Sequence, residues 1–271
     1  AMVRARSGDW QVGTVGTHDM RDEDKPEIRK LALFRDMSPD NFETLMQAAY
    51  AHAFPAQLEM IRQGEPADFL HIVMEGTVEL FSGWRDRETT MAVVRPVSTF
   101  ILAACIKDAP YLMSARTVEK SRIIMIPAKD LRATFRLDPE FAVSTITELA
   151  NCYRSVVRHA KGLKLRNSKE RVAAYICRQS RLAGNAASFI LPVEKRLLAS
   201  YLGMTPENLS RAIKSLQSDG VAVDGMRIII TDLKALEAIA GPDALIDGPG
   251  TEMPGANLAD MQVAGMRRKA N

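Results

Sequence analysis

Three side chains able to hydrogen-bond nucleic-acid bases stand close together in the C-terminal third of the chain. Glu207, Ser210 and Arg211 have spacings of three and four residues from the glutamate, so on a helix they share one face. Thr205 and Pro206 precede them and predict the helix start, because threonine caps helices and proline suits the first helical position. A carboxylate, a hydroxyl and a guanidinium on one helix face can contact base edges in the major groove. The pattern predicts a DNA-recognition helix; the alternative is a solvated amphipathic helix.

The flanking segments predict the elements that would position this helix. Residues 193–202 have apolar side chains at helical spacing, and Gly203 ends that helix, so the two helices form a helix-turn-helix. Asp224-Gly225 lies between the β-branched runs 220–223 and 227–230, which is a hairpin signal. A helix pair followed by a hairpin predicts a winged helix-turn-helix.

The segment Glu207–Arg211 resembles the Glu-x-x-Ser-Arg recognition motif of the Crp/Fnr superfamily of bacterial transcription regulators. It is closer to the Fnr branch, because the cyclic-AMP receptor branch usually has glycine where this chain has Ser210. Residues 64–80 resemble the hairpin signature of the family's sensory β-barrel. The resemblance covers roughly residues 28–240, and it implies a regulator that binds double-stranded DNA as a homodimer and contacts RNA polymerase.

The expected fold class is α+β. It comprises an N-terminal double-stranded β-helix (jelly-roll) sensor domain, a long dimerisation helix and a C-terminal winged helix-turn-helix. The expected boundaries are a flexible N-terminal tail or expression remnant at 1–25, the sensor domain at 26–137, the dimerisation helix at 138–165, the DNA-binding domain at 166–240 and a flexible C-terminal tail at 241–271.

Within the sensor region, the apolar spacing predicts short helices at 28–34 and 39–51, followed by strands from about 57 to 126. Alternating apolar and polar residues in 77–81 and 89–94 predict half-buried strands. Short strands separated by turn residues favour a barrel or jelly roll.

Apolar residues recur at helical spacing from 139 to 165. This length exceeds what one small domain needs, and in the resembled family the equivalent helix pairs with its twin. We therefore expect a dimerisation helix, with a buried single-domain helix as the alternative. The expected seam residues are Ile146, Leu149, Tyr153 and Val156.

The charge distribution supports a polyanion partner. The formal net charge is only +3, but thirteen basic residues lie between Arg154 and Lys214, opposed by three glutamates, and such a local excess is typical of nucleic-acid binding. By resemblance, Lys195 contacts the DNA backbone. The expected DNA-binding residues are Glu207, Ser210, Arg211, Lys195, Thr205 and Lys214.

The cyclic-nucleotide cassette of the resembled family is degenerate here. Leu102 and Ala103 occupy the place of its Gly-Glu pair, and Met113 stands where its arginine would bind the cyclic phosphate. Burying a phosphate without a cationic partner is costly, so cyclic nucleotides are not expected. The Fnr-type iron–sulfur cluster is not expected either, because no cysteine precedes Cys105.

The sensor's effector stays open at this point. A packed core without ligand, a haem held by His71 or Cys105 for gas or redox sensing, a thiol switch at Cys105 or Cys177 and an unidentified apolar ligand are the alternatives. The residues expected to line an effector pocket are His71, Met91, Phe100, Leu102, Cys105 and Met113.

The sequence contains no nucleophile elbow, P-loop or paired histidine spacing for a metal, so we expect neither an enzyme nor a metal site. No apolar run approaches the ~20 residues of a membrane span, and three widely spaced cysteines favour a reducing cytoplasm. A rival interpretation is a regulatory module that uses its barrel to bind a protein partner instead of DNA.

Overall fold

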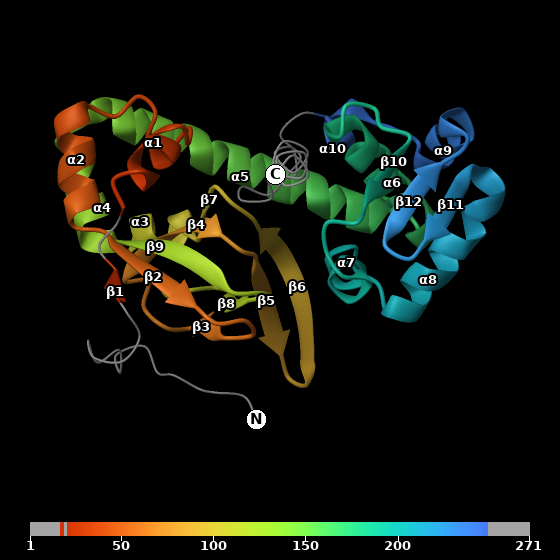
Figure 1. Ribbon diagram of the computed structural model, residues 1–271, viewed down its shortest axis with the longest axis horizontal. Helices are drawn as coiled ribbons and strands as arrows, with labels where there is room; N and C mark the ends of the chain where they lie inside the picture. The colour runs from red at the N-terminus through yellow and green to blue at the C-terminus, as the bar shows by residue number, and fades with distance from the viewer. Residues whose placement is uncertain (1–16, 19–20, 249–271) are drawn as a thin grey trace, which may run out of the picture. The chain divides into compact units, whose positions relative to one another are not determined.

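The computed structural model describes residues 17–18 and 21–248 (Figure 1). The chain divides into two compact units, and the boundary between Tyr153 and Arg154 falls inside the long helix α5 (Pro139–Leu165). None of the helices within the described residues combines the length and the apolar character needed to cross a bilayer.

Two antiparallel sheets form the N-terminal unit (Figure 1). The first has the strand order β1 (Thr17–His18), β2 (Tyr50–Phe54), β9 (Ser121–Pro127), β4 (Phe69–Glu75) and β7 (Ser98–Phe100). The second has the order β3 (Glu59–Ile61), β8 (Ser114–Thr117), β5 (Val78–Trp84) and β6 (Arg87–Val94). The accompanying helices are α1 (Asp24–Arg29), α2 (Pro39–Gln47), α3 (Leu102–Lys107) and α4 (Ala128–Thr134).

One apolar core lies between these sheets. Ile72 and Ile124 of the first sheet and Val78, Leu80 and Ala115 of the second are all buried in the same cluster. Strand side chains alternate between faces, and β6 follows this rule in 89–94, as its sequence predicted. The two-sheet arrangement expected from the strand pattern is therefore confirmed.

The segment 64–80 is not a paired hairpin, which corrects the sequence interpretation. Strand β4 pairs with β7 and β9, whereas β5 pairs with β6 and β8. Gly76 joins the sheets with φ at +88°, and a Cβ there would come within 2.7 Å of the backbone at Lys120 and Ser121. Gly76 thus marks a close crossing between the sheets, which only glycine tolerates.

The N-terminal helices also differ from the prediction. Helix α1 covers Asp24–Arg29 and is followed by turns at 31–37, so the helix expected at 28–34 is wrong. The helix expected at 39–51 ends at Gln47, because strand β2 begins at Tyr50 and pairs with β9.

The expectation of a flexible tail at 1–25 is wrong where the structure describes this region. Strand β1 pairs with β2, and Asp24, only 3% exposed, accepts two hydrogen bonds from Arg122 at 2.6 and 2.8 Å. Residues 1–16 and 19–20 lie outside the described residues.

The C-terminal unit surrounds a second core with helices and a small sheet. Helix α6 (Ser168–Leu182) begins with a capping box in which Asn167 and Glu170 exchange hydrogen bonds. The sheet has the order β10 (Ser188–Ile190), β12 (Arg227–Ile230) and β11 (Val221–Asp224). The remaining elements are α7 (Lys195–Tyr201), α8 (Pro206–Ser215), the 3₁₀ turn η1 (Gln217–Asp219), α9 (Leu233–Ala240) and α10 (Ala244–Asp247).

The predicted helix pair and β11–β12 hairpin are both present, so the winged helix-turn-helix is confirmed. Strand β10 was not predicted. The expected C-terminal tail from residue 241 is wrong for 241–248, which contain α10, and 249–271 lie outside the described residues.

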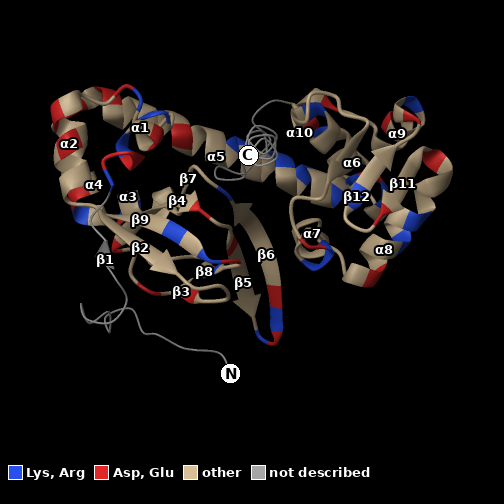
Figure 2. Cartoon of the chain, in the orientation of Figure 1, with Lys and Arg blue, Asp and Glu red and all other residues tan. Residues whose placement is uncertain are grey.

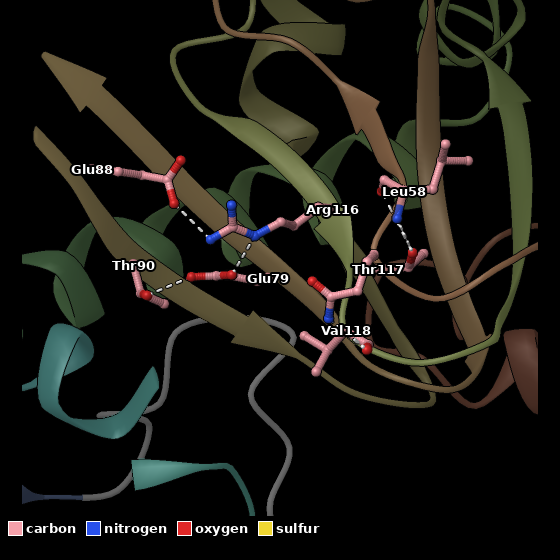
Figure 3. A network of polar contacts seen from close by, with 8 residues as sticks. Leu58, Glu79, Glu88, Thr90, Arg116, Thr117 and Val118 are labelled. Carbon is pink, nitrogen blue, oxygen red and sulfur yellow. Dashed lines mark hydrogen bonds and ion pairs between the residues drawn. The ribbon is translucent and has the colours of Figure 1, made fainter. Parts of the chain in front are cut away.

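A buried ion pair ties three strands of the second sensor sheet together (Figure 3). Glu79 of β5 accepts hydrogen bonds from Arg116 of β8 at 2.7 Å and from Thr90 of β6 at 2.5 Å. Arg116 also donates to Glu88 at 2.6 Å and stacks over the Phe81 ring. Residues 77–81 are therefore buried on both faces, not half-buried as the alternation predicted.

We expect Glu79→Ala to lower the free energy of unfolding by about 3–5 kcal/mol, because it leaves the buried Arg116 without its main counter-charge. The matched control Glu88→Ala removes a 44% exposed partner of the same arginine and should cost no more than about 1 kcal/mol. Urea denaturation followed by circular dichroism measures both. Equal losses in the two variants would show that burial of Glu79 does not set the strength of this network.

Candidate nucleic-acid interface

The apolar side of helix α8 anchors it to the C-terminal core. Thr205 caps the helix by accepting a hydrogen bond from the Asn208 amide at 3.3 Å, and Pro206 follows as its first residue. Leu209, Ala212 and Ile213 are buried in the core. This packing fixes the rotation of α8 about its axis, so the opposite side must face solvent.

The four expected side chains of α8 lie together on this exposed side. Glu207, Ser210, Arg211 and Lys214 are all exposed, and their spacing of three, four and seven residues places them on one face. Figure 2 shows acidic and basic positions along this short helix. The polar face predicted for this helix is therefore exposed in the structure. We call Glu207, Ser210, Arg211 and Lys214 the reading face of α8.

Hydrogen bonds within the first turns of α8 orient two side chains of this face, Arg211 and Glu207. The Arg211 guanidinium donates to the Asn208 side-chain oxygen at 2.6 Å; Asn208 is a neighbour that the sequence analysis missed, although its i, i+3 spacing signals the pair. Hydrogen bonding to the Glu207 backbone amide and the Thr205 hydroxyl, together with the Arg211 charge, lowers the pKa of Glu207. The carboxylate is therefore ionised at neutral pH and accepts hydrogen bonds only.

Lys195 and Thr205 lie at the N-terminal ends of α7 and α8. Lys195 is the first residue of α7 and is half-buried. The hydroxyl of Thr205 accepts the cap hydrogen bond from Asn208 and donates its one proton to the Glu207 carboxylate. Amides at helix starts and nearby cations suit phosphate oxygens. The backbone-contacting role expected for both residues stays a prediction.

Several basic residues counted in the sequence have structural roles, which corrects the simple charge argument. Arg166 forms a two-point ion pair with Asp247 at 2.6 and 2.7 Å. Lys169 pairs with Asp219 at 2.7 Å, and Arg171 donates to main-chain carbonyls. The basic excess offered to a polyanion is thus smaller than the sequence count.

The comparison with protein families agrees with both units. Residues 51–138 match the cyclic nucleotide-binding domain family, and residues 170–239 match the Crp-like helix-turn-helix domain family. The chain belongs to the Crp/Fnr family of transcription regulators. Its C-terminal unit is the DNA-binding domain and its N-terminal unit is a cyclic-nucleotide-binding-like domain.

Individual relatives align over most of their length. The chain is 26% identical over 240 residues to the transcriptional activator protein FnrL of Cereibacter sphaeroides, covering 80% of this chain and 91% of FnrL. It is 22% identical over 215 residues to a CRP-like cAMP-activated global transcriptional regulator of Mycobacterium tuberculosis, covering 77% and 96%. The structure of FixK2 from Bradyrhizobium japonicum has the same fold, with a TM-score of 0.63, 22% identity and coverage of 72% and 99%.

The structure brings together several of the residues expected at an effector pocket of the sensor. His71 is buried and its ring stacks on Phe100 at 5.1 Å between centroids. The thiol of Cys105 donates to the Phe69 carbonyl at 3.1 Å, two residues before His71. Leu102 is buried in the same core and Met113 packs against it. Met91 is 38% exposed on β6 and does not line the interior, so its assignment is wrong.

These residues form a packed layer. Phe100 covers one face of the His71 ring. A haem iron would bind a ring nitrogen and not the ring face, so the haem alternative stays a prediction. Burial lowers the pKa of His71 to about 3 and keeps its imidazole neutral, and burial raises the pKa of Cys105 to about 12, so its thiol stays protonated. A cavity of about 270 Å³ in this unit is lined by none of the six expected residues, although Phe69 and Arg132 in its wall both contact Cys105. Its lining residues are Tyr50, Asp68, Phe69, Pro127, Ala128, Lys129 and Arg132.

The residues expected at the degenerate cassette lie at the start of helix α3 and just before strand β8. Leu102 begins helix α3 and is 5% exposed, where the family carries part of its Gly-Glu pair. Met113 precedes β8, and the hydroxyl of the next residue, Ser114, accepts a hydrogen bond from the Gln63 amide at 3.0 Å. The side chains at the two expected contact points, Ala103 for the carboxylate and Met113 for the arginine, are apolar.

Helix α5 carries an apolar stripe on its surface. Ile146, Tyr153 and Val156 are 67%, 71% and 51% exposed. Leu149 differs from them, because it packs against the core of the sensor. The stripe is completed by Val143 and Val157, which are 58% and 39% exposed.

Proposed function

We propose that this protein is a homodimeric transcriptional activator that binds a TTGAT–ATCAA-like palindrome and responds to an effector other than a cyclic nucleotide. The observation that carries the proposal is the reading face of α8, where Glu207, Ser210 and Arg211 are held outward by a buried apolar side. The activator role is supported by the relative FnrL, which is named a transcriptional activator. RNA polymerase is the partner that activation by this family implies.

Each reading residue has a base that suits its chemistry. Arginine donates two hydrogen bonds to guanine, a glutamate carboxylate accepts from the cytosine amino group, and serine can contact either member of a thymine–adenine pair. Arg211 reaches its base with the donors that its single bond to Asn208 leaves available, since a guanidinium has five N–H groups. The half-site sequence itself rests on the resemblance to the Fnr branch.

Two observations support a dimer: the number of bases that one helix can contact, and the exposed apolar stripe on α5. One recognition helix contacts too few bases to be selective, and two helices fit successive major grooves when their half-sites lie about 34–36 Å apart. Val143, Ile146, Tyr153, Val156 and Val157 form an exposed apolar stripe on one side of a 27-residue helix. An apolar stripe of this kind is typical of a helix that pairs with another helix.

We expect Arg211→Ala to weaken binding to the cognate palindrome by about 1–3 kcal/mol and to relax the preference at the guanine. Lys195→Ala is the contrasting variant, because a lost phosphate contact should weaken binding to all sequences alike and reduce the salt slope by about one unit. Selection from a random duplex library followed by fluorescence anisotropy measures both effects. A non-palindromic or unrelated consensus would contradict the base assignments.

Tyr153→Glu and Ile146→Glu should convert the dimer to a monomer, because each places a charge in the apolar stripe. Asn151→Glu is the control, since Asn151 is exposed on α5 away from the stripe. Light scattering should give the mass of one 29.9 kDa chain for the two stripe variants and twice that mass for the control. Stripe variants that remain dimers with full affinity for the palindrome would place the interface elsewhere.

Titration calorimetry with cyclic AMP and with cyclic GMP should show no binding, because Met113 and Ala103 provide neither the cation nor the carboxylate of the cassette. The M. tuberculosis relative, which is named as cAMP-activated, serves as the positive control under identical conditions. Micromolar binding to this protein would mean that other residues recognise the nucleotide.

A further inference from the structure

The last two turns of α5 pack against the helix-turn-helix through one helix face. His159, Gly162, Leu163 and Arg166 have spacings of three and four residues, so they lie on the same side. The ring of His159 lies 4.8 Å from that of Tyr201, at the end of α7. All of these residues belong to the C-terminal unit.

The turn between α7 and α8 approaches this face closely. Gly203 has φ at +64°, and a Cβ at this position would lie 2.9 Å from the Leu163 side chain. The left-handed backbone favours glycine here, and the Leu163 methyl group would have to shift to admit a Cβ. The same turn sets the start of α8, because Thr205 caps that helix two residues later.

Arg171 bridges the two elements from helix α6. Its Nη1 atom donates to the carbonyls of Arg166 at 2.7 Å and Leu163 at 3.2 Å, which are among the carbonyls at the end of α5 that the helix itself leaves unpaired. Its Nη2 atom lies 3.5 Å from the carbonyl oxygen of Gly203 in the turn. One rigid guanidinium thus contacts both the end of α5 and the turn before the reading helix.

Helix α10 holds the end of α5 from another side. The Arg166 guanidinium donates to both carboxylate oxygens of Asp247 and to the Gly241 carbonyl at 3.0 Å. The two side chains of the pair are only 9% and 11% exposed. The Asp247 carboxylate also accepts from the Asp243 amide at 2.9 Å, and Ile246 lies over Gly162.

We propose that Arg171 and the Arg166–Asp247 pair are positioning residues for DNA reading. They clamp the α7–α8 turn to the end of α5, and so they fix the direction in which α8 leaves that helix. None of the three belongs to the reading face of α8. In the dimer of the proposed function, on which this inference rests, a fixed direction of α8 sets the half-site spacing that the two reading helices can fit.

The test uses the full chain and four single variants. Arg171→Lys keeps the charge but replaces the planar, multi-donor group with a compact ammonium, and Asp247→Asn removes the charge that holds Arg166. Their matched controls are Arg181→Lys on the exposed side of α6 and Glu237→Gln on the exposed side of α9. Each variant is titrated with the selected palindrome, with the same palindrome carrying one extra central base pair, and with a random duplex.

We expect wild type and controls to prefer the native spacing strongly. Arg171→Lys and Asp247→Asn should lose about tenfold in affinity for the native spacing, equivalent to about 1.4 kcal/mol, and so lose most of the spacing preference. Their affinity for the random duplex should be unchanged. A variant that was only less stable would weaken all three titrations in proportion, so an unchanged spacing preference in both variants would overturn the proposal.

Amide hydrogen exchange without DNA separates this inference from the proposed function. In the two clamp variants, exchange should accelerate at residues 203–205 and 163–166, while the β11–β12 hairpin keeps its protection. If wild type selects no palindrome, the proposed function fails, yet faster exchange confined to these segments would still support the clamp. Exchange that is unchanged there, or that rises throughout the C-terminal unit, would contradict it.

Discussion

The central constraint on this protein is the sequence of helix α5, because different parts of that helix pack on different structures. Its start packs in the N-terminal core, its end packs on the helix-turn-helix, and an apolar stripe stays exposed. Phe141 and Thr145 near its start are buried, and Phe141 lies within the sensor core. Its end packs on the helix-turn-helix through Leu163 and Arg166. The exposed apolar stripe shares no residue with either packed face. Because an α-helix has 3.6 residues per turn, each position of α5 points to one particular side. The residue type at that position must therefore suit the core, the helix-turn-helix or the exposed stripe.

In α8, too, burial of one side of the helix determines which side chains face solvent. Its polar side chains face solvent because Leu209, Ala212 and Ile213 hold the other side in the core. Local sequence specifies this arrangement almost completely: Thr205 and Pro206 define the start, and the apolar spacing defines the buried side. For this reason the helix, its partner helix and the hairpin were all predictable from the chain alone.

Features that depend on contacts distant in sequence were not predictable. Gly76 marks a crossing between sheets because it approaches Ser121, and nothing near residue 76 reveals this. Glu79 looked like the solvent-facing member of an alternating strand, but Arg116 lies opposite it on β8 and allows its burial. Likewise Asp247 belongs to a segment whose Gly and Pro content predicted a tail, and its partner Arg166 lies 81 residues away. Met91 was placed in the pocket by residue type alone, and strand alternation turns it outward.

The account rests on two reading helices that occupy successive major grooves of one DNA. Methylation protection of the selected palindrome by the wild-type protein tests this most directly, because arginine bound to guanine shields the N7 atom that the reagent attacks. The account predicts one protected guanine in each half-site, with half-site centres about 10 base pairs apart, and loss of both protections in Arg211→Ala. Protection of a single guanine, or the same protections in Arg211→Ala, would contradict it.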